Sequence, residues 1–251
     1  MRYGDPGRGA RQVSGQEASG PARPVLLLVP GAWHGAWVWE KVQPALTARG
    51  WVVQTMDLPS NADRGRPRCG LYDDAAAVRQ RIQGIEGPAV VVAHSYGAVP
   101  VTQGAANLPN VRHLVYVCGF MLDVGESPLG LLGTEPDWWV IDGDIMTVDN
   151  PRAVFFHDVG QEDADRAIAR MTPFSRVAAT QALTAAAWHS VSSTYIVCDG
   201  DAEMSEAQYM FAKRATDIRH LPSSHSPMLS MPSELTNLIV EAADRAIRLG
   251  P

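Results

Sequence analysis

The sequence predicts an α/β fold, with a mostly parallel, doubly wound sheet and helices on both of its faces. Short runs rich in valine and leucine alternate with longer segments whose apolar residues recur at helical spacing. Such alternation is typical of a parallel sheet that is covered on both sides. With 251 residues, of which 46% are hydrophobic, the chain is long enough for one such domain with a full core.

Each expected strand is a short apolar run that ends in glycine, proline or polar residues. These runs cover residues 25–29, 51–56, 89–93, 111–121, 194–198 and 217–221. Helices are expected before residue 50, over 71–85, over 98–106 and over 232–249. The last of these has its apolar residues on one face, as expected for a helix packed on a sheet.

Two segments fall outside this alternation. Residues 1–23 contain Gly, Arg, Ser, Gln and Pro without an apolar block, which predicts a disordered leader and not a signal peptide. The α/β domain is then expected over residues 24–251. Within it, residues 122–190 interrupt the strand–helix order, and an insertion of that size is typical of a helical lid.

Charge and composition argue against several classes of protein. The net charge is −6, so the chain lacks the basic surface that binds nucleic acid or acidic lipid. No run approaches 18 apolar residues, so we expect no membrane span and a cytoplasmic location. The three cysteines show no metal-binding spacing, and Cys118 and Cys198 fall in predicted strands, which suits reduced, buried thiols.

The segment around Ser95 has the pattern of a nucleophile elbow. A valine-rich strand leads directly to His94-Ser95-Tyr96-Gly97, and a helix of small residues follows. The strained turn of an elbow needs small residues two positions before and after the serine, and these positions hold Ala93 and Gly97. The alternative is an ordinary turn between a strand and a helix, in which the serine only caps the helix.

Partners for Ser95 follow two later strands. His225 is the one histidine of seven in a loop after the last strand, and Asp199 and Asp201 follow the strand before it. Polar groups at the carboxyl ends of parallel strands meet at one edge of the sheet. An imidazole activates a serine, and a carboxylate orients the imidazole. Asp201 is favoured as this carboxylate, because its distance from the strand lets it curl toward His225, and Asp199 is expected to cap the turn.

An acyl-transfer site also needs two backbone amides for the oxyanion. One is expected from Tyr96, directly after the serine. The other is expected from Ala32, in the loop after the first strand, where Gly31 allows a tight turn. Gly31 and Gly35 are equally explained as plain turn residues.

Aromatic residues are concentrated near these loops and in the insertion. Trp33 in the first loop, with Trp138 and Trp139 in the insertion, could line a substrate pocket. The alternative is that the two insertion tryptophans form only the insertion's own core.

Six segments in chain order resemble one family: PGAWHGAWVW, DLPS, VVVAHSYGA, LVYVCGFM, STYIVCDGD and SSHSP. Together they resemble the α/β-hydrolase family, in the branch of plant methylesterases, hydroxynitrile lyases and bacterial esterases. The resemblance extends over about residues 24–250. It implies an eight-stranded sheet, a helical lid, no cofactor, and a triad that matches Ser95, Asp201 and His225. It also implies oxyanion amides at Ala32 and Tyr96, and a structural role for His34.

The sequence departs from the family pattern in three ways. Pro30 replaces a histidine in the first loop, and Asp199-Gly200-Asp201 replaces Thr-Glu-Asp. Gly31 and Ser226 stand where the lyases of this branch have threonine and lysine, which argues against cyanohydrin chemistry.

The sequence therefore predicts a serine esterase that needs neither a cofactor nor a metal. Its substrate is expected to be a small or medium carboxylic ester or a lactone, and a homodimer is left open. Two alternatives remain: a non-hydrolytic enzyme (a lyase, an acyl transferase or a cofactorless oxygenase) and a ligand-binding receptor with a slow triad.

Overall fold

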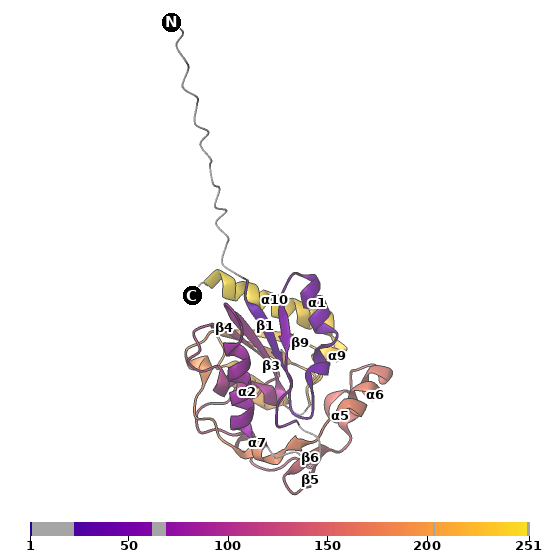
Figure 1. Cartoon of the computed structure of the whole chain (residues 1–251). Helices are drawn as coiled ribbons and strands as arrows, with labels where there is room; N and C mark the ends of the chain where they lie inside the picture. Colours follow the sequence, from indigo (N-terminus) through magenta and orange to yellow (C-terminus); the bar gives the residue numbers. More distant parts are fainter. Residues whose placement is uncertain (2–22, 62–68, 203, 250–251) are drawn as a thin grey trace.

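The structure is a computed structural model, in which residues 1, 23–61, 69–202 and 204–249 are described (Figure 1). The predicted leader, apart from its two end residues, lies outside the described residues. So does the middle of the loop expected over residues 57–70.

The centre of the fold is a parallel sheet in the order β2-β1-β3-β4-β8-β9. This confirms the predicted fold class. The described residues place six strands in this sheet, not the eight that the family resemblance implied. The strands are β1 (Val25–Val29), β2 (Val53–Thr55), β3 (Ala89–His94), β4 (Val111–Val117), β8 (Ser193–Cys198) and β9 (Asp217–Leu221).

The register of the sheet brings the carboxyl ends of its central strands together. Val29 pairs with Ala93, His94 pairs with Val117, and Cys198 pairs with Leu221. β4 stops at Val117, four residues earlier than predicted, because Cys118 turns the chain with a φ of 36°. The loops after β1, β3, β8 and β9 therefore meet at one edge.

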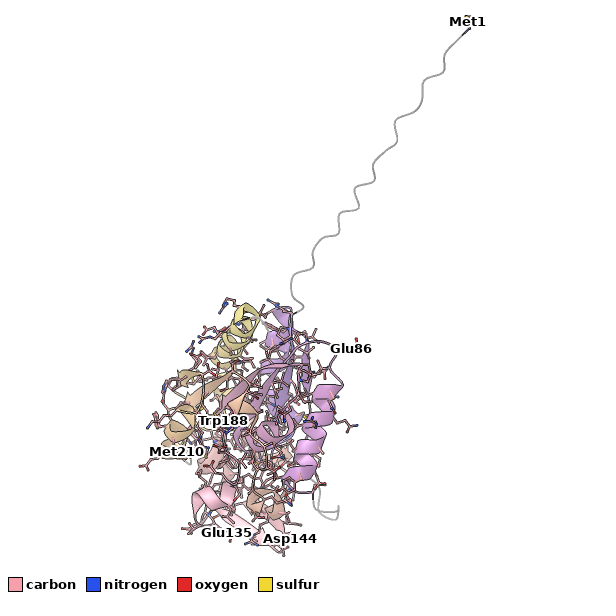
Figure 2. All side chains as sticks on the ribbon, turned by 90° about the vertical axis from the view of Figure 1, so that its left-hand side faces the viewer. Met1, Glu86, Glu135, Asp144, Trp188 and Met210 are labelled. Atoms are coloured by element: carbon pink, nitrogen blue, oxygen red, sulfur yellow. The ribbon has the colours of Figure 1, made fainter. Side chains whose placement is uncertain are left out.

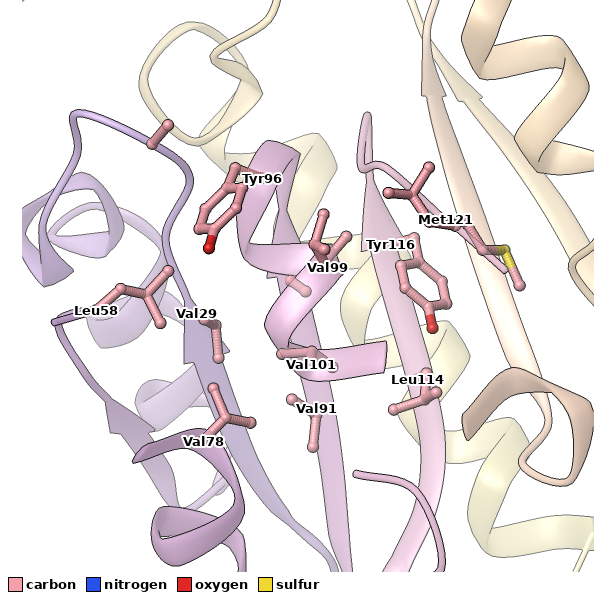
Figure 3. Close-up of a cluster of buried hydrophobic side chains, with 14 of the residues drawn as sticks. Val29, Leu58, Val78, Val91, Tyr96, Val99, Val101, Leu114, Tyr116 and Met121 are labelled. Atoms are coloured by element: carbon pink, nitrogen blue, oxygen red, sulfur yellow. The ribbon is translucent and has the colours of Figure 1, made fainter. Parts of the chain in front are cut away.

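Helices cover both faces of the sheet (Figure 1). Alternate strand residues point to opposite faces, so each face has its own core. Leu26 and Leu28 face a core shared with α1 (Val42–Ala48) and α10 (Pro232–Leu249). Leu27 and Val29 face the other core, which includes residues of α2 (Leu71–Gln83), α3 (Ala98–Gly104) and α8 (Ser205–Ala212). Figure 3 shows part of this second core, where Val78 of α2 lies next to Val29 of β1 and Val101 of α3 lies next to Val91 of β3.

Residues 122–190, here called the insertion, separate β4 from β8. Their helices are α4 (Pro128–Leu132), α5 (Pro151–Phe155), α6 (Gln161–Arg170), α7 (Arg176–Thr180) and the 3₁₀ turn η3 (Ala187–His189). The insertion was predicted to be helical, and this is only partly correct. It also contains an antiparallel sheet of β5 (Trp139–Asp142), β6 (Ile145–Val148) and β7 (Phe174–Ser175). In Figure 2, its residues Glu135 and Asp144 lie at the opposite end of the molecule from Glu86, which precedes β3.

The β5–β6 hairpin had a sequence signal. Asp142 pairs with Ile145, so Gly143 and Asp144 form a two-residue connection, and Gly143 has a φ of 63°. Gly-Asp between two apolar runs is a hairpin signal, because this tight turn needs a positive φ at its first residue, which glycine adopts at no steric cost.

Among the described residues, no helix combines the length and the apolar character needed to cross a membrane.

Candidate active site

Ser95 lies at a sharp turn between β3 and α3, on the short 3₁₀ turn η2 (Ser95–Gly97). Its φ of 51° is the strained, left-handed conformation expected of a nucleophile elbow. The turn also packs against the first loop. A Cβ on Gly97 would lie 2.3 Å from the carbonyl oxygen of Pro30, and one on Gly31 would lie 2.8 Å from Cβ of Ser95. Two glycines therefore let the first loop approach Ser95 closely.

The three polar residues predicted from separate strands come together at this edge. The His225 Nε2 atom lies 2.9 Å from Ser95 Oγ, and His225 Nδ1 lies 2.7 Å from Asp201 Oδ2. A carboxylate only accepts, so Nδ1 donates to Asp201 and leaves Nε2 able to accept from Ser95. The residues are 8%, 3% and 1% exposed for Ser95, His225 and Asp201, so water competes little with these bonds.

The main-chain carbonyl of His225 accepts hydrogen bonds from two buried side chains. Nε2 of His94 donates to the His225 carbonyl oxygen over 2.8 Å, and the Cys118 thiol donates to the same oxygen over 3.4 Å. Burial holds the pKa of His94 well below its usual value, so this imidazole is neutral and carries its proton on Nε2. His94, which the sequence placed beside the nucleophile with no further role, therefore supports the loop of His225.

The prediction that Asp199 caps the turn is wrong. Its Oδ1 accepts from the Tyr209 hydroxyl over 3.1 Å and faces Nδ1 of His220 at 2.9 Å, on the surface. The strand end is held by Gln208, which has the spacing of a capping box with Ser205 in the sequence but binds Cys198 in the structure. The buried Gln208 side chain accepts from the Cys198 amide over 2.8 Å and donates to the Cys198 carbonyl over 3.2 Å.

The loop before His225 is tied to the insertion. Asp158 accepts from the Ser224 amide over 2.8 Å and also from the Ser224 hydroxyl. The insertion thus contacts the chain one residue away from the imidazole that faces Ser95.

The first loop, residues 30–35, carries the predicted oxyanion residue Ala32. His34 Nδ1 donates to the Ala32 carbonyl over 2.6 Å, and burial lowers the pKa of His34 to about 4, so it is neutral near pH 7. This geometry fits the structural role that the family resemblance implied. Trp33 has a φ of 62°, an uncommon conformation for a bulky residue, and its indole donates to the Met146 carbonyl over 2.9 Å.

A cavity opens beside Ser95 and His225. Ala32 and Tyr96 also line it, so both predicted oxyanion residues lie at the same cavity as the serine. Its walls are otherwise apolar, and among the described residues no Asp, Glu, Lys or Arg lines it. Besides Tyr96, six aromatic residues among those described line the wall: Trp33, Phe120, Trp138, Trp139, Phe155 and Phe174.

Trp33 is central to this wall. Its ring lies 5.6 Å from that of Trp138 and 6.2 Å from that of Trp139, both in edge-to-face geometry. The insertion's tryptophans thus pack on the first loop and face the cavity, rather than forming only a separate core of the insertion.

Three buried side chains could bring metal-binding atoms together: those of His94, Cys118 and His225, whose donor atoms lie within 4.8 Å of one another. Both imidazoles already donate hydrogen bonds, to the His225 carbonyl and to Asp201. The cluster is therefore described more simply as the support of the His225 loop.

A comparison with models of protein families identifies the family of this chain. The model of the alpha/beta hydrolase family matches residues 26–238, most of the chain. The chain belongs to this family. The resemblance predicted from the six sequence segments is thereby confirmed.

The similar proteins include plant and bacterial enzymes. Methylesterase 9 of Arabidopsis thaliana is 29% identical over 252 residues, which cover 87% of this chain and 98% of the relative. The crystal structure of a pyrethroid hydrolase from Sphingobium faniae has a TM-score of 0.75 at 23% identity, and covers 88% of this chain and 97% of that one. Polyneuridine aldehyde esterase has a TM-score of 0.74 at 20% identity, and covers 88% and 99%. At these identities the two structures show the shared fold.

Proposed function

We propose that this alpha/beta hydrolase is a carboxylic ester hydrolase that works through an acyl-enzyme on Ser95. The observation that carries the proposal is the hydrogen-bonded series Asp201–His225–Ser95 at an apolar cavity. Relatives named as methylesterases and esterases support ester cleavage as the reaction.

In the first half of the reaction, His225 removes the proton of Ser95 while its oxygen attacks the ester carbonyl. Asp201 keeps the imidazole in the required tautomer and stabilises the imidazolium that forms. The amides of Ala32 and Tyr96 bind the developing oxyanion, a contribution for which the loss of one donor typically costs about 10²–10³ in kcat. The imidazolium then gives its proton to the leaving alcohol.

In the second half, a water molecule takes the place of the alcohol. His225 removes one proton from this water, which attacks the acyl carbonyl, and the acid leaves as Ser95 regains its proton. Each proton lost is returned within the cycle, so the residues of this chain suffice for the chemistry.

The cavity suggests the class of substrate. Its aromatic wall favours an uncharged, apolar ester or lactone of small or medium size. A substrate that carries a free carboxylate beside its ester group would find no Lys or Arg among the described lining residues to pair with it. The insertion serves as the lid over this substrate, since its Trp138 and Trp139 face the cavity. A cytoplasmic location and a homodimer stay predictions.

A labelling experiment tests the proposal. The unmodified protein should hydrolyse p-nitrophenyl esters and react with a fluorophosphonate probe at Ser95. Ser95→Ala should abolish both, whereas Ser193→Ala, which removes a buried hydroxyl at the amino end of β8, should keep both. Activity that survives Ser95→Ala would overturn the mechanism. A folded protein that binds esters without cleaving them would instead support the alternative hypothesis of a ligand-binding receptor.

A further inference from the structure

Asp74 is a fully buried carboxylate that the reaction described above does not use. It lies in the first turn of α2, and burial raises the pKa of Asp74 to about 6 although hydrogen bonds from Ser60 and Tyr96 lower it. A buried carboxylate is costly unless it is well paired, so its partners indicate what it holds in place.

The first partner is the residue after the nucleophile. The Tyr96 hydroxyl donates to Asp74 Oδ2 over 2.7 Å. Figure 3 shows the Tyr96 ring directed from the elbow into the buried cluster, on the side of Leu58 and Val29. The same ring contacts Phe174 of the cavity wall at 4.6 Å between centroids. Asp74 therefore anchors the side chain of the residue whose amide is one of the two oxyanion donors.

The second partner leads to the other donor. The Ser60 amide donates to Asp74 Oδ1 over 2.8 Å, and Asn61 follows directly. The Asn61 Nδ2 atom donates to the carbonyls of Gly31 and His34, over 2.9 and 2.8 Å. Its Oδ1 accepts from the Trp33 amide over 2.8 Å. One amide side chain thus binds the first loop on both sides of Ala32.

We propose that Asp74 and Asn61 are positioning residues that set the spacing of the two oxyanion amides. The inference rests on the proposed function, and it goes beyond the triad by naming what holds the oxyanion hole in shape. Asp74 ties Tyr96 to Ser60, and Asn61 ties the next residue to the loop of Ala32. The two amides come from loops after different strands, so a side-chain link from one loop to the other fixes their separation.

Such a link matters because an oxyanion hole tolerates little displacement. A misplacement of about 1 Å can lower the rate about 10²-fold. The first loop is also strained at Trp33, and strained backbone persists only where surrounding contacts hold it. The hydrogen bonds of Asn61 restrain this loop from the side of residues 57–61, and Asp57 accepts from the Ala36 amide where the loop ends.

The sharpest variant is Asn61→Asp, which keeps size and shape but replaces two donated bonds by a carboxylate facing two carbonyl oxygens. We expect kcat for p-nitrophenyl esters to fall about 10–100-fold with KM within about 3-fold, because the oxyanion forms only after binding. The affinity for a trifluoromethyl ketone, whose adduct with Ser95 carries the oxyanion, should fall by a similar factor. Asp74→Ala should act in the same way, and Tyr96→Phe more weakly.

Asn110→Asp is the matched control. The Asn110 Nδ2 atom donates to the Ile82 carbonyl over 2.9 Å at the amino end of β4, far from the oxyanion amides. This variant should lose stability without a change in kcat or in ketone affinity. Melting temperatures of all variants separate stability from catalysis, and Tyr96→Phe and Asn61→Asp decide the matter if Asp74→Ala does not fold.

Two results overturn the inference. If the parent protein is active but folded Asn61→Asp and Tyr96→Phe keep its kcat and ketone affinity, the positioning role is wrong and the proposed function stands. If the parent protein neither cleaves esters nor forms the ketone adduct, the proposed function fails and the inference fails with it.

Discussion

The sheet and the insertion are built in different ways. The central strands β1, β3, β4 and β8 are almost completely buried, and they are paired along their length. The insertion contacts the rest of the chain partly through exposed ion pairs of α6, such as Arg170 with Glu40 and Lys41 with Asp163. Exposed pairs of this kind contribute about 0–1 kcal/mol each, far less than the burial of a strand.

This difference separates two tasks. Groups that must keep a geometry within tenths of an ångström, such as Ser95 and His225, sit at the ends of rigid strands. The walls that select a substrate come largely from the insertion, where a change of residues leaves the sheet intact. The predictions below test whether catalysis and substrate preference divide along this line.

The largest effect is expected at the sheet. Asp201→Asn should lower kcat about 10⁴-fold, because an amide facing His225 Nδ1 favours the wrong tautomer. Asp199→Asn, at a residue two positions earlier whose carboxylate contacts surface partners, should change kcat less than about 3-fold. Steady-state kinetics on one ester measure both. A severe defect in Asp199→Asn with a mild one in Asp201→Asn would reverse the assignment.

A smaller effect concerns the stability of the sheet at low pH. Burial lowers the pKa of His113 to about 4, so the unfolded chain binds this proton near pH 6.5 and the folded chain only near pH 4. Stability should therefore fall by up to about 3 kcal/mol from this residue as the pH drops through that window. Asp74, whose pKa is raised, acts in the opposite direction.

His113→Gln should flatten the dependence of unfolding free energy on pH between about 6.5 and 4, as measured by urea denaturation. The matched control is His157→Gln, which changes an exposed imidazole of the insertion and should leave the slope as it is. Equal slopes in the parent and in His113→Gln would show that His113 is not a source of the acid sensitivity.

The smallest effect is expected at the cavity wall. Trp138→Ala or Trp139→Ala should shift the preference along acetate to octanoate esters, because an apolar pocket discriminates by about 1–3 kcal/mol per methylene. Probe labelling of Ser95 should persist. Trp188→Ala is the control, because its indole donates to the Leu122 carbonyl and does not line the cavity. An unchanged profile of kcat/KM in both cavity variants would mean that other residues select the substrate.

Strands were predicted more accurately than the insertion, for a physical reason. A strand buried on both faces is a continuous apolar run, and β9 and α10 have the predicted boundaries. The insertion has short elements whose apolar residues face several surfaces, so no single period appears in its sequence. The β5–β6 hairpin was not predicted despite its Gly143-Asp144 signal, because the whole of residues 122–190 was predicted to be helical.

Within the site, the sequence predicted the residues that carry chemistry and missed those that support them. Ser95, Asp201 and His225 each follow a recognisable strand, and the structure brings them within hydrogen-bonding distance. Their catalytic roles stay predictions. The supporting roles of His94 and Gln208 could not be predicted from their local sequence, because a side chain that supports a loop can come from any element that passes nearby.

By itself, the sequence determined the parallel sheet, its covering helices and the order of Ser95, Asp201 and His225, because these follow from local apolar runs and turns. Only the tertiary structure decided that Asp74 reaches Tyr96, that Asn61 binds the first loop, and that Trp138 and Trp139 join Trp33 at the cavity. These contacts join residues 22 to about 105 positions apart. They depend on how loops approach one another after the sheet has formed, which local patterns do not encode.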